Sequence, residues 1–140
     1  MAGYSGTPLA KKLGIREGHR VAWLGAPSTF AALLGELPLG VRVRKAARVA
    51  HSLDVIVLFA KAMSDLTGRL RGAADALAYD GGLWIAWPKK ASGIQTDVGE
   101  SAVRKAGLDV GLVDNKVCAI DEKWSGLRFV HRVGERPRES

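Results

Sequence analysis

The fold is decided by one apolar stretch, Asp80-Gly81-Gly82-Leu83-Trp84-Ile85-Ala86-Trp87-Pro88-Lys89-Lys90. Its five consecutive apolar residues, Leu83 to Trp87, are typical of a strand that is covered on both faces of a sheet. The two glycines before them predict a turn into this strand. Pro88 has no amide hydrogen for a ladder hydrogen bond, so we expect pairing to stop there. The stretch predicts a buried central strand that ends at a proline and two lysines.

Length and composition fit one globular domain. The chain has 140 residues, of which 47% are hydrophobic, and such a chain can bury a substantial core. No apolar run approaches the roughly 20 residues of a membrane span, and the first residues lack the basic and apolar regions of a signal peptide. We therefore expect a cytoplasmic protein. Cys118 is the single cysteine, which excludes an internal disulfide, and we interpret it as a small buried hydrophobe.

The chain is strongly basic, with a formal net charge of +7. This charge favours anionic partners such as nucleotides, phosphorylated metabolites or nucleic acid. The densest basic run is the segment 42–48, with Arg42, Arg44, Lys45 and Arg48, and it provides one hypothesis, a protein or nucleic-acid interaction surface. Most aromatic residues lie inside apolar runs rather than between basic residues, which speaks against a surface that stacks bases.

Apolar periodicity predicts strands that alternate with helices. The expected strands span 21–24, 41–43, 53–59 and 83–87, and the expected helices span 7–14, 28–37, 61–78 and 97–106. Thr7 and Ser28 are the expected N-caps of the first two helices, with Pro8 at the first helical position. Gly68 and Gly72 are interpreted as positions that let the long helix pack closely on the sheet. Gly107 is the expected end of the last helix.

The C-terminal part predicts a β-hairpin. Two extended segments, 111–120 and 127–132, flank a polar turn. Strands alternating with helices and a final hairpin indicate an α/β fold, three-layer and Rossmann-like, whose mostly parallel sheet ends in a C-terminal antiparallel hairpin. We expect a single domain over residues 1–133, which includes an N-terminal arm and short helix over residues 1–14. Residues 134–140 are expected to form a disordered tail.

The order of these elements resembles the second half of a class I methyltransferase. The resemblance rests on the strand 53–59, the long helix, Asp80-Gly81-Gly82 with its strand, and the closing helix and hairpin. It implies a Rossmann-like fold and, as an alternative function, a divergent S-adenosylmethionine-dependent methyltransferase. The family's glycine-rich first loop is here Gly25-Ala26-Pro27-Ser28, in which only Gly25 matches and Pro27 lacks an amide hydrogen. The acidic residue after the second strand and one strand-helix unit are missing.

Four segments are similar to the signature segments of a small bacterial family that is described only as a domain of unknown function. They are 3–14, 83–93, 111–122 and 124–130. This resemblance covers nearly the whole chain. It implies a bacterial, single-domain protein and carries no known activity, cofactor or oligomeric state.

A ligand site is expected beyond the carboxyl ends of the parallel strands, where open sheets of this class bind ligands. Three predicted strands end there, at Gly25 to Ser28, at Lys61, and at Trp87 to Lys90. The predicted ligand-binding residues are Gly25, Ser28, Lys61, Trp87, Pro88, Lys89, Lys90, Ser92, Gly93 and Thr96. The lysines supply positive charge, and the last three residues lead into a helix whose free amides can bind an anion.

The leading functional hypothesis is therefore a module that binds a small anionic or nucleotide-like ligand without catalysis. The alternative interpretation of the same residues is structural: the lysines are solvated, and residues 92–97 cap the helix. A second polar cluster, Asp114, Lys116, Asp121, Glu122 and Trp124, surrounds the hairpin. If both residues are extended, alternation puts Asp114 and Lys116 on the same face, which allows a cross-strand or same-face ion pair. The three histidines, His19, His51 and His131, have no metal-ligand spacing.

Overall fold

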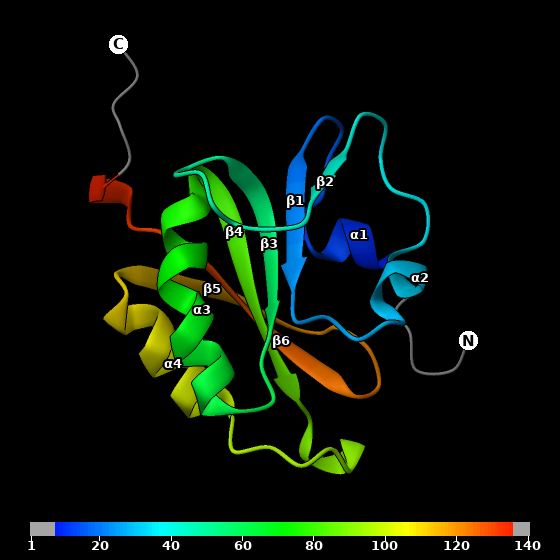
Figure 1. Ribbon diagram of the computed structural model, residues 1–140, viewed down its shortest axis with the longest axis vertical. Helices are drawn as coiled ribbons and strands as arrows, with labels where there is room; N and C mark the ends of the chain where they lie inside the picture. Colours follow the sequence, from blue (N-terminus) through cyan, green and yellow to red (C-terminus); the bar gives the residue numbers. More distant parts are fainter. Residues whose placement is uncertain (1–7, 136–140) are drawn as a thin grey trace.

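A six-stranded sheet forms the centre of the protein (Figure 1). The structure is a computed structural model that describes residues 8–135. The strands are β1 (Arg20–Leu24), β2 (Arg42–Arg44), β3 (Leu53–Phe59), β4 (Leu77–Pro88), β5 (Leu112–Ala119) and β6 (Trp124–His131). The helices are α1 (Leu9–Lys12), α2 (Phe30–Leu34), α3 (Met63–Ala76) and α4 (Glu100–Asp109), with 3-10 turns η1 (Lys90–Ser92) and η2 (Val133–Glu135).

The strand order is β2-β1-β3-β4-β6-β5. Strands β2, β1, β3 and β4 are parallel to one another, whereas β6 is antiparallel to both β4 and β5. The predicted α/β, Rossmann-like fold with a closing antiparallel hairpin is therefore confirmed. Helices α3 and α4 cover one face of the sheet, and α1 and α2 cover the other.

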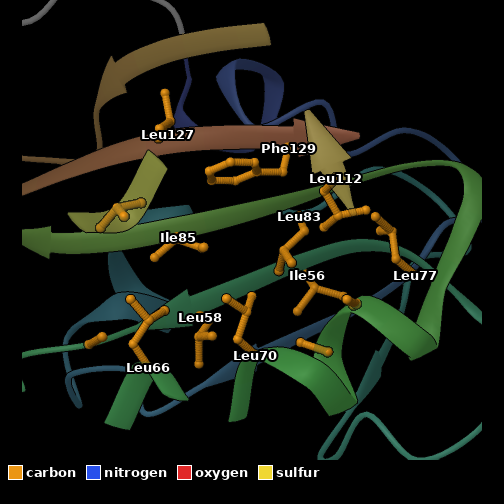
Figure 2. Close-up of a cluster of buried hydrophobic side chains, with 14 of the residues drawn as sticks. Ile56, Leu58, Leu66, Leu70, Leu77, Leu83, Ile85, Leu112, Leu127 and Phe129 are labelled. Carbon is orange, nitrogen blue, oxygen red and sulfur yellow. The ribbon is translucent and has the colours of Figure 1, made fainter. Parts of the chain in front are cut away.

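Strand β4 is buried on both faces, as its apolar run predicts. Leu83 and Ile85 join the cluster that packs against α3, while Trp84 and Ala86 join the cluster under α1 and α2. Figure 2 shows the first cluster, in which β4 side chains meet Leu66 and Leu70 of α3, with β3 and β6 side chains beside them. Pro88 is the last residue of β4 and pairs with Trp124, so the predicted end of the strand is confirmed.

The predicted glycine turn before this strand is wrong. Helix α3 ends at Ala76, β4 begins at Leu77, and Asp80-Gly81-Gly82 lies inside the strand. The pairing with β3 shifts there, from Leu53 opposite Leu77 to Val55 opposite Gly82. A Cβ on Gly81 would lie 2.7 Å from the Asp54 carbonyl oxygen. The glycines therefore permit an irregular strand to approach its neighbour closely, which is a second common use of glycine in sheets.

Several predicted helix ends are also corrected. The five-residue helix α2 has Thr29 rather than Ser28 at its N-cap and is followed by Gly35 at φ +70°. Pro8 is the N-cap of α1 rather than its first residue, and the proposed cap Thr7 lies outside the described residues. Helix α4 begins after Gly99 and continues past Gly107. The first two residues of the expected tail, Gly134 and Glu135, belong to the 3-10 turn η2, and residues 136–140 lie outside the described range.

The glycines of the helices have roles that differ from the expected ones. Gly68 and Gly72 of α3 are exposed, and a Cβ on either would meet nothing within 4 Å, so they do not serve close packing. A Cβ on Gly107 would instead overlap the ring of Phe129. Close contact between α4 and β6 thus depends on Gly107.

The indole of Trp84 ties the N-terminal helix to the sheet. Its Nε1 donates a buried hydrogen bond of 3.0 Å to the Leu13 carbonyl, at the end of α1. Buried backbone carbonyls are nearly always paired, and an unpaired one costs stability.

We predict opposite effects for two helix-interior glycine substitutions. Gly107→Ala should lower the free energy of unfolding by about 1–3 kcal/mol because the added methyl group overlaps Phe129. Gly68→Ala should raise it by up to about 1 kcal/mol, since alanine favours the helix and the site is open. Urea denaturation measures both. Equal effects of the two substitutions would contradict this account of α4 packing.

We also predict that Trp84→Phe destabilises the protein by at least about 1–3 kcal/mol, because the Leu13 carbonyl loses its buried donor. Trp23→Phe is the matched control, since Trp23 is half-buried and its indole donates no hydrogen bond within the described residues. Thermal unfolding compares the two. Similar losses in both variants would show that ring volume, and not the hydrogen bond, matters.

Candidate functional site

The carboxyl ends of β1, β3 and β4 lie at one edge of the sheet, as the sequence predicts (Figure 1). After β1 the chain passes to α2 on one face, and after β3 it passes to α3 on the opposite face. In open α/β sheets, ligands bind beyond the ends of adjacent parallel strands whose connections leave in opposite directions. We call this place in the fold, beyond the ends of β1 and β3 between Gly25 and Lys61, the crevice.

Arg69 lies in this crevice, and the sequence analysis did not single it out. Gly25 has φ +66°, and a Cβ built on it would lie 2.5 Å from Nη1 of Arg69 and 3.0 Å from the Phe59 carbonyl oxygen. The guanidinium of Arg69, carried by α3, therefore covers the backbone of Gly25. Within residues 8–135 no carboxylate forms an ion pair with Arg69.

The loops after β3 and before α4 are held together beside the crevice. The Thr96 hydroxyl donates a hydrogen bond of 2.5 Å to the Lys61 carbonyl. Next to this contact, the Met63 amide donates a 2.8 Å hydrogen bond to the Asp97 carboxylate. The predicted residues Lys61 and Thr96 are thus brought together, through the backbone of one and the side chain of the other. The exposed Lys61 side chain remains available at the edge.

The hydroxyls of Ser92 and Thr96 stabilise the loop between β4 and α4. Ser92 Oγ donates to the Lys89 carbonyl at 2.6 Å and accepts from the Ile94 amide at 3.1 Å. Thr96 Oγ1 also accepts from the Val98 amide at 3.0 Å. Gly93 is left-handed, with φ +78°, and ends η1. These hydrogen bonds stabilise the loop itself, as expected if residues 92–97 have a structural role. Residues 92–97 do not cap the helix, however, because the N-cap of α4 is Gly99.

The remaining predicted residues lie in different surroundings. Trp87 and Pro88 are buried, and the Lys89 amide donates to the Lys123 carbonyl at 2.8 Å. Lys90 and Ser28 are exposed. Lys89 and Lys90 therefore place positive charge just beyond the end of β4, and Trp87 and Pro88 before them are buried.

Three surface cavities are lined by other residues. One of about 440 Å³ lies between α2 and the β5–β6 turn and is lined by Thr29, Ala32, Leu33, Asp121, Glu122 and Lys123. Another of about 370 Å³ is a mainly apolar groove between α3 and α4. The third, of about 260 Å³, lies near the amino ends of β1 and β3, next to Asp54, Asp80 and Arg128.

The polar cluster around the hairpin has structural contacts. The expected Asp114–Lys116 ion pair is wrong, because the pairing of β5 with β6 shifts between these two residues and breaks their alternation. Asp114 instead contacts Arg104 at 3.1 Å, and Glu100 contacts the same guanidinium at 3.0 Å. Hydrogen bonds to the two carboxylates raise the pKa of Arg104 above its ordinary value.

The other members of that cluster shape the turn. The Asp121 carboxylate accepts hydrogen bonds of 2.8 Å from the amides of Lys123 and Trp124. Trp124 is buried and packs edge-on against Phe59, with ring centres 5.1 Å apart. Glu122 is exposed.

Two histidines that are distant in sequence come together beside Leu77, the first residue of β4. His51 Nδ1 and His131 Nε2 each lie 3.0 Å from the Leu77 carbonyl oxygen, and the His51 ring stacks on Tyr79 at 4.0 Å. His19 accepts a hydrogen bond from the Arg16 amide. Among residues 8–135 no group of three or more His, Cys, Asp or Glu is arranged to hold a metal ion.

Comparison with known proteins gives a family and a fold. A family profile described as "Protein of unknown function (DUF3052)" matches residues 45–133. The chain belongs to this family. No curated protein matches the chain. The expected resemblance to a family of unknown function is thereby confirmed, and the DUF3052 match spans β3 to β6, including Arg69 and the loop after β4.

Several solved structures similar to this DUF3052 protein are S-adenosylmethionine-dependent methyltransferases. A putative type 11 methyltransferase from Sulfolobus solfataricus has a TM-score of 0.65 at 16% identity, with 93% of each chain covered. A SAM-dependent methyltransferase from Aquifex aeolicus has a TM-score of 0.56 at 16% identity, with 86% of each chain covered. Fibrillarin from Aeropyrum pernix, solved with natively bound S-adenosyl-L-methionine, has a TM-score of 0.55 at 17% identity, with 91% of this chain and 70% of that chain covered. At such low identity the likeness shows the fold alone.

No helix within the described range is both long and apolar enough to cross a membrane.

The thiol of Cys118 on β5 is half-buried, and its pKa lies above the ordinary value. Burial raises the pKa of its thiol more than the charges of Lys12 and Lys116 lower it. We predict that a disulfide reagent reacts with Cys118 more slowly than with N-acetylcysteine near neutral pH, because less thiolate is present. The reaction rate should still be rising where the free thiol has reached its plateau. Reaction in urea is the control, and a midpoint below that of N-acetylcysteine would contradict the prediction.

Proposed function

We propose that this protein is a Rossmann-like module that binds a small anionic or nucleotide-like ligand in the crevice between β1 and β3. The observation that carries the proposal is the Arg69 guanidinium, which covers Gly25 at the strand ends and has no carboxylate partner among the described residues. We assign it a binding role rather than catalysis.

The chemistry of the crevice suits phosphate or carboxylate. Arginine presents a planar fork of donors that matches both groups in bidentate geometry. Gly25 adds no side chain above its backbone and adopts φ +66°, which lets the guanidinium lie directly over the end of β1. The exposed ammonium of Lys61 adds a second positive charge at the same edge, which favours the same ligands.

The position of the crevice supports a small ligand. Beyond the ends of parallel strands, the connections to α2 and α3 diverge to opposite faces of the sheet, which is the usual geometry of a nucleotide site in this architecture. Lys89 and Lys90 extend the positive edge beyond β4. A nucleotide would place its phosphates toward these cations.

A divergent methyltransferase is the second candidate, and the fold of the solved relatives favours it. Two features of this chain depart from that family. Pro27 in the first loop has no amide hydrogen to offer a cofactor, and β2 ends at Arg44, where the family has an acidic residue for ribose hydroxyls. S-adenosylmethionine also carries a positive sulfonium, which the charge of Arg69 repels.

We predict that the wild-type protein binds ATP, AMP or a phosphorylated metabolite in isothermal titration calorimetry. Arg69→Gln should weaken this binding by about 10- to 100-fold, because a charge-assisted hydrogen bond is lost. Arg71→Gln is the matched control, since Arg71 lies on the same helix but lines the groove between α3 and α4. It should leave the affinity within about two-fold at physiological salt.

The same experiment separates the alternatives. Lys61→Gln and Lys89→Ala/Lys90→Ala show whether the other cations contribute. Binding that is unchanged by Arg69→Gln, or absent with every anionic compound, would sink the proposal. S-adenosylmethionine binding that strengthens in Arg69→Gln, together with transfer of its labelled methyl group, would favour the methyltransferase.

A further inference from the structure

Strand β2 forms one edge of the sheet, and its outer side has no partner strand among residues 8–135. It pairs only with β1, with Arg42 opposite Arg20 and Arg44 opposite Ala22. The Arg42 amide donates to the His19 carbonyl at 2.9 Å. In a parallel pair, alternate residues direct their backbone groups to a given neighbour. The amide and carbonyl of Val43 therefore face outward, where they are free to pair with another chain.

Exposed apolar residues occur in β2 and in the segments that flank it in sequence. Six large hydrophobic residues are exposed in the described chain. Three of these lie within residues 39–49, namely Leu39 at 82%, Val43 at 46% and Val49 at 66% exposure. We call residues 39–49 the edge segment. Exposed apolar groups beside an unpaired strand provide contact area for a partner chain.

The edge segment is also uniformly basic. Arg42, Arg44, Lys45 and Arg48 are all exposed, and none has an ion-pair partner within the described residues. No acidic residue lies between Glu36 and Asp54. Arg44 pairs with Ala22, which faces the α3 side of the sheet, so alternation places Arg42 and Arg44 on that face and Val43 on the other.

We propose that the edge segment docks an acidic, extended segment of a partner protein, which adds to the sheet as a strand alongside Val43. Backbone groups of Val43 supply hydrogen bonds, Leu39 and Val43 supply apolar contact, and the four cations select acidic side chains. This surface is separate from the crevice, because it lies along the outer side of β2 and not at the ends of β1 and β3.

Charge and composition decide among the occupants. A second copy of this chain pairing β2 to β2 would bring like charges together, and basic side chains on an edge strand oppose such pairing. Nucleic acid needs cations but has no use for apolar groups between them, and the edge segment has no aromatic residue for base stacking. An acidic peptide strand uses the cations, the apolar groups and the free backbone together.

The test is an NMR titration of isotope-labelled protein with the peptide Glu-Val-Glu-Val-Glu-Val-Glu, blocked at both ends. We expect amide shifts centred on residues 41–45 and hydrogen exchange of the Val43 amide slowed by about ten-fold or more on saturation, since a new backbone hydrogen bond protects it. The same peptide with lysine in place of glutamate should produce no such shifts. Added salt should weaken binding of the glutamate peptide.

Two variants separate backbone pairing from charge attraction. Val43→Pro removes the outward amide hydrogen and keeps all four cations, so it should abolish binding, whereas Val43→Thr keeps the amide and should bind like the wild type. Arg42→Gln/Arg44→Gln should weaken binding about ten-fold. Circular dichroism verifies that each variant is folded, and exchange of the Val43 amide in the wild type provides the readout if Val43→Pro does not fold.

The proposal is overturned if the glutamate peptide leaves residues 41–45 unperturbed, or if Val43→Pro binds it as well as Val43→Thr does. It is also overturned if an oligothymidylate perturbs the edge segment in all variants while the peptide does not, which would make this a nucleic-acid surface. Nucleotide binding in the crevice is measured separately, and its failure leaves these outcomes unchanged.

Discussion

Burial of β4 on both faces is the constraint on which the rest of the structure depends. A strand that is apolar on both sides needs a layer of helices on each face, and here Leu83 and Ile85 meet α3 while Trp84 meets α1. The Trp84 indole adds a directional contact to this packing, because its hydrogen bond to the Leu13 carbonyl ties the end of α1 to β4. The parallel half of the sheet lies on one side of β4, and the hairpin lies on the other.

The same packing positions the candidate site. Leu66 and Leu70 hold α3 against β3 and β4, and this orientation directs Arg69 toward the end of β1. The start of α3 is fixed by Asp97 through the Met63 amide and by Asp65 through the Ala62 amide. The carboxylates of Asp97 and Asp65 thus accept hydrogen bonds at the beginning of α3. The same helix carries Arg69, and its packing on the core places the Arg69 guanidinium over Gly25.

Positive charge occurs at two surfaces with different geometry. At the strand ends it lies beside Gly25, whose left-handed backbone favours glycine, and this arrangement fits a small anion. Along β2 it accompanies exposed valine and leucine and an unpaired backbone edge, which fits an extended acidic chain. A net charge of +7 by itself indicates only anionic partners; the exposed apolar groups and free backbone distinguish one partner from the other.

Hydrophobic periodicity in the sequence determined the fold class, the two-sided burial of Leu83 to Trp87, the hairpin and the shared edge of the strand ends. It did so because period and apolar run length reflect how each element is covered. Tertiary structure alone decided the rest. Arg69 reaches Gly25 only because strand order places β3, on which α3 packs, next to β1. Asp114 meets Arg104 rather than Lys116 only because a bulge breaks the alternation. Gly81 and Gly82 predict a turn locally, yet the close approach of β3 keeps them inside a strand. Contacts between residues distant in the chain depend on register and helix orientation, which local sequence patterns do not encode.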